Sequence, residues 1–239
     1  MKRLPYLLLL FLPVSIAAQN APEVNGERLN QSLETLASYG KDKNGQPNRV
    51  AFSDGDLEGR AYVIGLMEKA GLETTVDAAG NIIGRRPGNN PDLKPIGFGS
   101  HIDMVPHGGN YDGCVGSMAA VEVAQVLQEK GLQTNHPLEL IIFSNEEGGV
   151  MGSRALAGTL KPEALGVVNS TGYSMGQGIE RLGGDTTRIA EIARPKGSLA
   201  AFLELHIEQG GILDRENLDV GVVEGIVGLR WWDVTVKGM

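Results

Sequence analysis

The amino-acid sequence predicts an α/β protein in which helices pack on a mixed sheet. Two observations lead to this class. Apolar stretches of strand length alternate with stretches in which apolar residues recur at helical spacing. The chain also holds 34 glycines against 5% aromatic residues, which is typical of many tight turns. With 41% hydrophobic and 21% charged residues, its 239 residues are excluded from the collagen-like, low-complexity and disordered classes.

The first residues have the pattern of a secretory signal peptide. Residues 1–3 are a short basic start, residues 4–14 are an apolar run, and residues 15–18 supply small side chains for cleavage. The run is shorter than the roughly 20 apolar residues that span a bilayer, so a membrane anchor is disfavoured. We therefore expect a signal peptide over 1–19 and a secreted or periplasmic protein, with no stable membrane span after cleavage.

The elements of the first third follow from periodicity and end signals. Leucines at helical spacing predict a helix over 27–39, which Gly40 ends. A second helix is expected over 57–70, after a capping signal in which Ser53 is followed by an acidic residue three positions later. Two short extended pieces around a turn are expected over 74–83.

The middle of the chain predicts a crossover unit. A strand over 95–100, a helix over 115–130 and a continuous apolar strand over 138–143 follow one another, which implies a helix-linked pair of strands on a buried sheet. Further strands are expected over 201–207 and over 231–236, where apolar residues alternate.

Charge and cysteine content restrict the partners. Acidic residues outnumber basic ones by 29 to 21, giving a net charge of −8, and the basic residues are scattered along the chain. No basic stripe could neutralise a phosphate backbone, so a nucleic-acid partner is not expected. The single cysteine, Cys114, excludes an internal disulfide and is expected as a small buried residue at the start of a helix.

Potential metal ligands follow the predicted strands, where open α/β sheets build their sites. These residues are His101, Asp103, Asp112, Glu146, Glu147 and His206. Imidazole and carboxylate groups without thiolates suit Zn²⁺, Mn²⁺ or Co²⁺ with open positions for water. The pattern therefore favours a catalytic metal site over a closed structural zinc site.

Spacing suggests a role for each of these side chains. His101 and Asp103 are two residues apart, so an extended backbone would let Asp103 orient the imidazole. Asp112 precedes a glycine-rich helix start and could bridge two metal ions. Glu146 and Glu147 would point to opposite sides of an extended backbone, so that one binds metal and the other faces water. This division suits hydrolysis.

Three motifs in order resemble a known family. They are the segments over 99–113, 144–149 and 204–210. They resemble the dinuclear zinc amidohydrolases that include N-carbamoyl-L-amino-acid hydrolases, allantoate amidohydrolases and β-ureidopropionases, within the aminoacylase and carboxypeptidase-type metallopeptidase group. The resemblance implies a mixed-sheet α/β/α catalytic domain of the zinc peptidase type, followed by an α+β lid and dimerisation domain. It implies a homodimer of the full-length protein.

The resemblance also implies roles for individual residues. It makes His101 and His206 ligands of one metal, Asp112 the bridging ligand, Glu147 a ligand of the second metal, Glu146 the general base, Asp103 the orienting residue and Gln209 a substrate contact. The implied reaction is hydrolysis of a non-peptide C–N bond in a linear amide, ureido compound or amidine by a metal-bridged hydroxide. The implied partner is a small-molecule ureido or amide substrate.

The resemblance also divides the chain into parts. It implies a catalytic domain over 20–222, lacking its returning segment and last metal-binding histidine, and the first strand of the lid domain over 223–239. The family's lid continues past the equivalent of Met239, so we expect a truncated product. Two alternatives stay open: an exported aminopeptidase or aminoacylase of the same group, and a non-catalytic metal-binding fragment. The segment over 170–197 receives no assignment.

Overall fold

The computed structural model describes residues 21–228, 230, 232 and 234–238. The predicted signal peptide lies outside these residues. Among the described residues, no helix is both long and apolar enough to cross a membrane.

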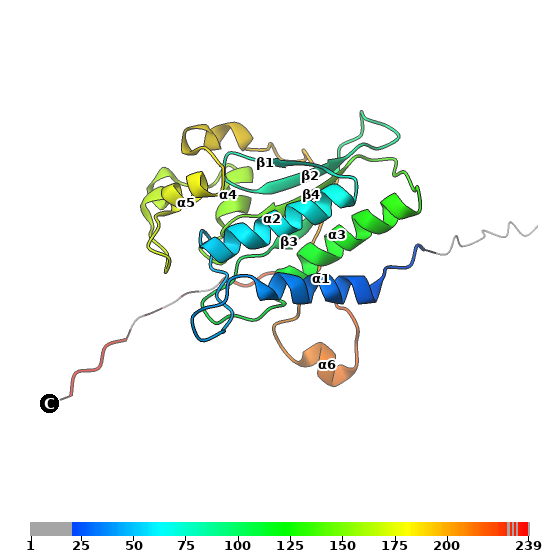
Figure 1. The fold of residues 1–239 in the computed structure, drawn as a ribbon. Coiled ribbons are helices and arrows are strands. Elements are labelled where there is room, and N and C mark those ends of the chain that lie inside the picture. The colour runs from blue at the N-terminus through cyan, green and yellow to red at the C-terminus, as the bar shows by residue number, and fades with distance from the viewer. Residues whose placement is uncertain (1–20, 229, 231, 233, 239) are drawn as a thin grey trace, which may run out of the picture.

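A five-stranded mixed sheet forms the centre of the fold (Figure 1). Its order is β1-β2-β4-β3-β5. β1 and β2 are antiparallel, β2 and β4 are antiparallel, and β3 is parallel to both β4 and β5. The strands are β1 (Glu73–Val76), β2 (Ile82–Arg86), β3 (Ile96–His101), β4 (Leu138–Phe143) and β5 (Ala201–Leu203). The predicted mixed α/β class is confirmed.

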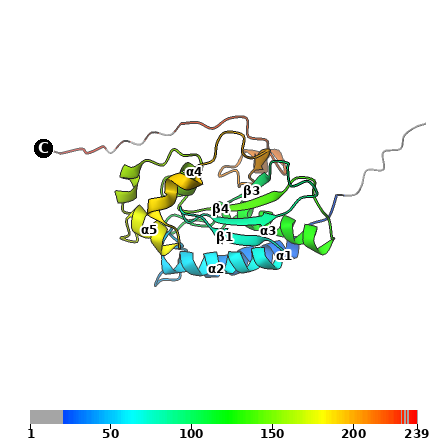
Figure 2. The ribbon, with the colours of Figure 1, turned by 90° about the horizontal axis from the view of Figure 1, so that it is seen from above.

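Three long helices cover one face of the sheet: α1 (Gly26–Ser38), α2 (Asp54–Lys69) and α3 (Cys114–Glu129). Figure 2 shows α1 and α2 along one side of the strands. The main core lies between these helices and the sheet, because every second side chain of β4 points toward them. Its fully buried members include Leu36, Val63, Met67, Ile82, Leu140 and Ile142.

The predicted crossover is present and positions the site. The helix α3 links β3 to β4, and the two strands pair in parallel with His101 opposite Phe143. Parallel strands end at the same edge of a sheet, so the residues after β3 and after β4 meet there. The predicted cap of α2 is also formed, since Ser53 Oγ accepts the backbone N–H of Asp56 at 3.1 Å.

Shorter elements lie beyond the end of the sheet where β4 finishes (Figure 1). A second apolar cluster, with Phe52 and Met151 among its members, joins them to the start of α2. These elements are α4 (Met151–Leu156), the 3-10 helix η1 (Pro162–Gly166), α5 (Met175–Arg181) and the 3-10 helix η2 (Thr186–Ile192). The last two occupy the stretch over 170–197 that the sequence left unassigned. Farther along the chain, α6 (Ile212–Glu216) follows the sheet.

Two strand predictions need correction. The strand predicted over 201–207 ends at Leu203, because β5 pairs with β3 only as far as Phe98 and the chain then crosses over α3. At that crossing the carbonyl oxygen of Leu205 comes so close to Gly116 that a Cβ there would lie 2.0 Å away. The strand predicted over 231–236 is absent from its described residues, which pair with no neighbouring strand. Trp231 and Asp233 lie outside the described residues.

Candidate metal centre

Three predicted ligands from distant parts of the chain converge at the carboxyl end of the sheet. His101 ends β3, Asp112 precedes α3, and His206 lies in the loop after β5. His206 Nε2 lies 3.0 Å and His101 Nε2 lies 4.0 Å from Asp112 Oδ1. One ligand atom from each residue lies within 4.8 Å of the others. Two imidazole nitrogens and a carboxylate oxygen at these separations fit a divalent ion with bonds of about 2 Å.

Two glycines allow this convergence. Gly113 has φ +61°, and a Cβ there would lie 2.3 Å from His101 Nε2. Gly116 lies under the chain that leads to His206, as its contact with the Leu205 carbonyl oxygen indicates. Any larger residue at either position would push a ligand segment away. The glycine-rich start of α3 therefore lets the ligand segments approach one another closely.

The buried imidazole of His101 is oriented by Asp103. His101 Nδ1 lies 3.0 Å from the Asp103 carbonyl oxygen and 3.6 Å from its carboxylate oxygen Oδ1, which leaves Nε2 facing Asp112. Burial by itself lowers the pKa of His101, but hydrogen bonding to Asp103 and the charges of Asp103 and Glu146 raise it to about 9. The nearest orienting atom is thus a backbone oxygen, which the sequence did not predict.

The carboxylate of Asp103 also holds the next loop. Its Oδ1 accepts the backbone N–H of Glu146 at 3.1 Å, and its Oδ2 accepts that of Glu147 at 3.1 Å. Asp103 is almost fully buried, so these bonds satisfy a charge that would otherwise be costly to bury. One side chain therefore fixes the loop after β3 to the loop after β4.

Glu146 and Glu147 lie in a turn, so the extended backbone expected for them is wrong. The carbonyl of Glu146 accepts the N–H of Gly149 at 3.1 Å and that of Val150 at 2.7 Å. Gly149 has φ +103°, a conformation that glycine adopts readily, and it lets the chain close this turn.

The two carboxylates are placed differently within that turn. Glu146 Oε2 lies 3.5 Å from His101 Nε2, and neither Glu146 nor Glu147 is part of the three-residue ligand cluster. Burial is the largest cause that raises the pKa of Glu146, and His101 opposes it. Burial also raises the pKa of Glu147, with Asp112 adding to it.

Gln209 contacts the ligand cluster directly. Its Nε2 donates a hydrogen bond to Asp112 Oδ2 at 2.8 Å. The backbone of Gln209 has φ +54°, which turns the chain after His206 back toward Asp112. Gln209, which the sequence predicts as a substrate contact, thus lies beside the cluster. It is bonded to Oδ2 of Asp112, whereas His206 faces Oδ1.

Arg49 is a site residue that the sequence analysis missed. Its side chain is fully buried. Its Nε donates to the Ile102 carbonyl at 2.8 Å, its Nη1 donates to the Leu36 carbonyl at 2.7 Å, and its Nη2 lies 3.1 Å from Cys114 Sγ. Arg49 therefore braces both ligand segments, the one around His101 and the one after Asp112. A charged residue directly before the apolar run 50–52 is the signal that could have revealed it.

The other two histidines lie away from the cluster, and the cysteine is buried as the sequence predicts. His107 is exposed beside Asp42, His136 contacts the Lys94 carbonyl oxygen, and both lie outside the cluster. Cys114 is buried as the first residue of α3.

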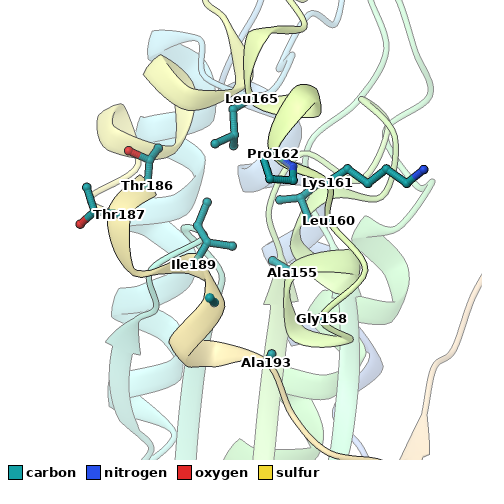
Figure 3. A pocket seen from close by; sticks show the side chains of 11 residues that line it. Ala155, Gly158, Leu160, Lys161, Pro162, Leu165, Thr186, Thr187, Ile189 and Ala193 are labelled. Carbon is teal, nitrogen blue, oxygen red and sulfur yellow. The ribbon is translucent and has the colours of Figure 1, made fainter.

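A separate cavity of about 330 Å³ lies between α4, η1 and η2 (Figure 3). Its wall is mostly apolar, with Ala155, Leu160, Leu165 and Ile189 among the residues that line it. None of the predicted ligands lines this cavity. The cavity is therefore separate from the cluster of predicted ligands.

Comparison with known proteins identifies the family. The family model described as Peptidase family M20/M25/M40 matches residues 97–238, which include every predicted site residue. The chain belongs to peptidase family M20/M25/M40. This M20 chain is 43% identical over 220 residues to an N-carbamoyl-L-amino acid amidohydrolase of Geobacillus stearothermophilus, covering 90% of this chain and 54% of that protein. It is 38% identical over 235 residues to a ureidoglycolate hydrolase of Arabidopsis thaliana, covering 94% and 49%.

Solved structures agree with this placement. A hydantoinase/carbamoylase family amidase from Burkholderia ambifaria matches with a TM-score of 0.73 and 34% identity, covering 82% of this chain and 48% of that one. The homologous amidase from Burkholderia multivorans matches with a TM-score of 0.73 and 35% identity, covering 82% and 48%. The M20 chain therefore spans about half the length of the relatives it matches.

Proposed function

We propose that the protein containing this chain is a metal-dependent amidohydrolase that cleaves a non-peptide C–N bond in a linear amide, ureido compound or amidine. The observation that carries the proposal is the convergence of His101, Asp112 and His206, with a Glu146 carboxylate oxygen 3.5 Å from His101 Nε2. The names of two relatives, an N-carbamoyl-L-amino acid amidohydrolase and a ureidoglycolate hydrolase, support this substrate class.

The cofactor we propose is a pair of divalent ions, Zn²⁺ in the first place, with Mn²⁺ or Co²⁺ as substitutes. His101, Asp112 and His206 would hold one ion, and Asp112 and Glu147 would contribute to the second. Bound ions of this kind polarise a carbonyl oxygen and lower the pKa of water.

Glu146 is the proposed general base and acid. It removes a proton from the attacking water, whose oxygen forms a bond to the carbonyl or ureido carbon. When the C–N bond breaks, Glu146 returns that proton to the leaving nitrogen. A carboxyl group with a raised pKa suits both steps, because it can hold the proton between them.

The remaining chain residues position these groups. Asp103 orients His101 and holds the backbone of Glu146 and Glu147. Gln209 is proposed to contact the substrate. For the full-length protein we further propose export through a signal peptide over 1–19, a periplasmic location and a homodimer. The basic start and apolar run support export, and the resemblance to the dinuclear amidohydrolases supports the dimer.

Product analysis with a Glu146→Gln variant tests the proposal. Ammonia release from an N-carbamoyl-L-amino acid and from allantoate is compared with amino-acid release from dipeptides and N-acetylated amino acids, using the purified full-length protein. We expect ammonia release that falls by about 10²-fold to 10⁴-fold in Glu146→Gln and is unchanged in His136→Ala, the control.

Three outcomes would contradict the proposal. Full turnover by Glu146→Gln would remove Glu146 from its role. Release of amino acids alone would favour an aminopeptidase or aminoacylase. Stabilisation by zinc without any turnover would favour a non-catalytic metal-binding protein, because a ligand that binds only the folded state stabilises it by mass action.

A further inference from the structure

Asn81 is a fully buried polar residue directly before β2, beneath the loop that bears Glu146 and Glu147. β2 runs antiparallel to β4, with Ile82 opposite Ile142. The start of β2 therefore lies beside the end of β4, where that loop begins. A buried amide needs partners for both its oxygen and its nitrogen.

The side-chain amide of Asn81 joins the two ends of this loop. Its Oδ1 accepts the backbone N–H of Ser144 at 3.0 Å, and its Nδ2 donates to the carbonyl oxygen of Gly152 at 3.2 Å. Nδ2 also donates to Asp77 Oδ2 at 2.8 Å, which fixes the orientation of the amide from the other side. Ser144 and Gly152 are the residues on either side of the segment 145–151.

The absence of a side chain at Gly152 makes room for this contact. A Cβ at Gly152 would lie 1.9 Å from Asn81 Oδ1 and 2.7 Å from the Ser144 nitrogen. The N–H of Gly152 also donates to the Ser144 carbonyl at 2.9 Å. Asn81, Ser144 and Gly152 thus form a closed joint that admits no larger residue at position 152.

The segment held by this joint has a backbone that needs outside support. Val150 has φ +51°, a left-handed conformation that is unfavourable for a β-branched residue, while Asn145 has φ +46°, which asparagine adopts more readily. Such conformations persist where surrounding contacts determine them. The joint holds the two ends of the segment, and Asp103 holds the amides of Glu146 and Glu147 near its middle.

We propose that Asn81 is a positioning residue for the reaction: by closing the loop 144–152, it places the carboxylate of Glu146 beside His101 and fixes the backbone that carries Glu147. This inference rests on the proposed function for the roles of the two glutamates. Asn81 touches neither the ligand cluster nor Glu146, and it acts through its bonds to Ser144 and Gly152 at the ends of the loop.

Backbone amide hydrogen exchange tests this role on the 239-residue chain without any assay of activity. In Asn81→Ala we expect the amides of Glu146 and Glu147 to exchange at least about tenfold faster, because the loop ends lose two buried hydrogen bonds. The amide of Leu140 in β4 should keep its protection. The matched control is Asn169→Ala, which removes a bond from an asparagine amide to the Ala51 carbonyl and should leave both glutamate amides unchanged.

A second variant covers the case in which Asn81→Ala does not fold. Gly152→Ala leaves Asn81 and its bond to Asp77 in the chain but puts a methyl group 1.9 Å from Asn81 Oδ1, which opens the joint, so the two glutamate amides should still exchange faster. Unchanged exchange at Glu146 and Glu147 would overturn the proposal. Equal acceleration of all slowly exchanging amides, Leu140 included, would also overturn it, because Asn81 would then only stabilise the fold.

Zinc binding and turnover complete the test. Zinc titration of Asn81→Ala should give the wild-type affinity at the cluster of His101, Asp112 and His206, since those residues lie outside the loop. In the full-length protein, kcat should fall about tenfold or more with KM unchanged. A rise in KM with kcat unchanged would overturn the positioning role. Absence of turnover in the wild type would refute the proposed function, while the exchange result would still decide the role of Asn81.

Discussion

Gln209 donates a hydrogen bond from Nε2 to Asp112 Oδ2 at 2.8 Å. The other oxygen of the same carboxylate, Oδ1, lies 3.0 Å from His206 Nε2. The two oxygens of Asp112 therefore have different partners. If Asp112 bridges two ions, as we propose, Gln209 and the second ion compete for Oδ2.

Replacing Gln209 with alanine tests that competition. Without the amide, Oδ2 loses this hydrogen bond, so we expect the second equivalent of zinc to bind roughly threefold to tenfold more tightly to Gln209→Ala, the range of a typical hydrogen bond. Calorimetric zinc titration of the two proteins measures this. An unchanged affinity for the second equivalent of zinc would mean that Gln209 does not compete for the carboxylate.

Replacing Asp103 with asparagine should change both His101 and the glutamate loop. Asp103 is the main group that raises the pKa of His101 to about 9, so in Asp103→Asn that pKa should be lower. The amide also leaves a single oxygen to accept two backbone N–H groups, and turnover should fall about 10-fold to 100-fold. Histidine NMR signals followed against pH in the metal-free protein measure the first effect. A His101 pKa that stays near 9 would refute the role of Asp103.

Replacing Gly113 with alanine should displace His101. The new methyl group would lie 2.3 Å from His101 Nε2, and φ +61° strains any residue other than glycine. Zinc affinity should fall by at least about tenfold. Gly109→Ala is the control in the same loop, because nothing lies within 4 Å of its Cβ position. Equal zinc affinities in the two variants would contradict the packing of Gly113 against His101.

Asp56 should make the stability of the folded chain depend on pH. Burial raises its pKa from the ordinary 3.8 to about 6, although Arg60 opposes the shift. Between these values the folded state binds more protons than the unfolded state. The stability that Asp56 contributes by binding a proton is therefore complete below pH 3.8 and is lost as the pH rises through 6. Asparagine cannot ionise, and it can still accept the backbone N–H that Phe52 donates to Asp56.

The free energy of unfolding of Asp56→Asn, relative to that of the wild type, should therefore increase by about 2 kcal/mol between pH 4 and pH 7, so that the variant becomes relatively more stable. Urea unfolding at the two pH values measures it. A difference that does not depend on pH would mean that Asp56 titrates normally in the fold.

The sequence predicted elements with a strong periodic pattern or clear end signals. β3, α3 and β4 are where apolar spacing and glycine placed them, because burial between a helix layer and a sheet leaves a direct pattern. The strand predicted over 201–207 was too long, because the contact between Leu205 and Gly116 is set by tertiary structure. The stretch over 170–197 has no periodic apolar face, and two short helical elements form there.

The ligand residues could be predicted because they follow strands whose ends meet at one edge. Their supporting contacts could not. Arg49 and Asn81 act through backbone carbonyl and N–H groups of residues far along the chain, and such bonds leave no spacing pattern in the sequence. The turn that carries Glu146 depends in the same way on Asp103. The carboxylate of Asp103 accepts two backbone N–H groups and holds them in a turn, where the sequence suggested an extended backbone.

The most direct test of the account is a crystal structure of the zinc-soaked protein, with the ion located from its anomalous scattering. We predict a zinc ion bonded at about 2.0–2.2 Å to His101 Nε2, His206 Nε2 and an oxygen of Asp112. Zinc found only elsewhere, for example at His136 or between His107 and Asp42, would contradict the metal centre and the function proposed from it.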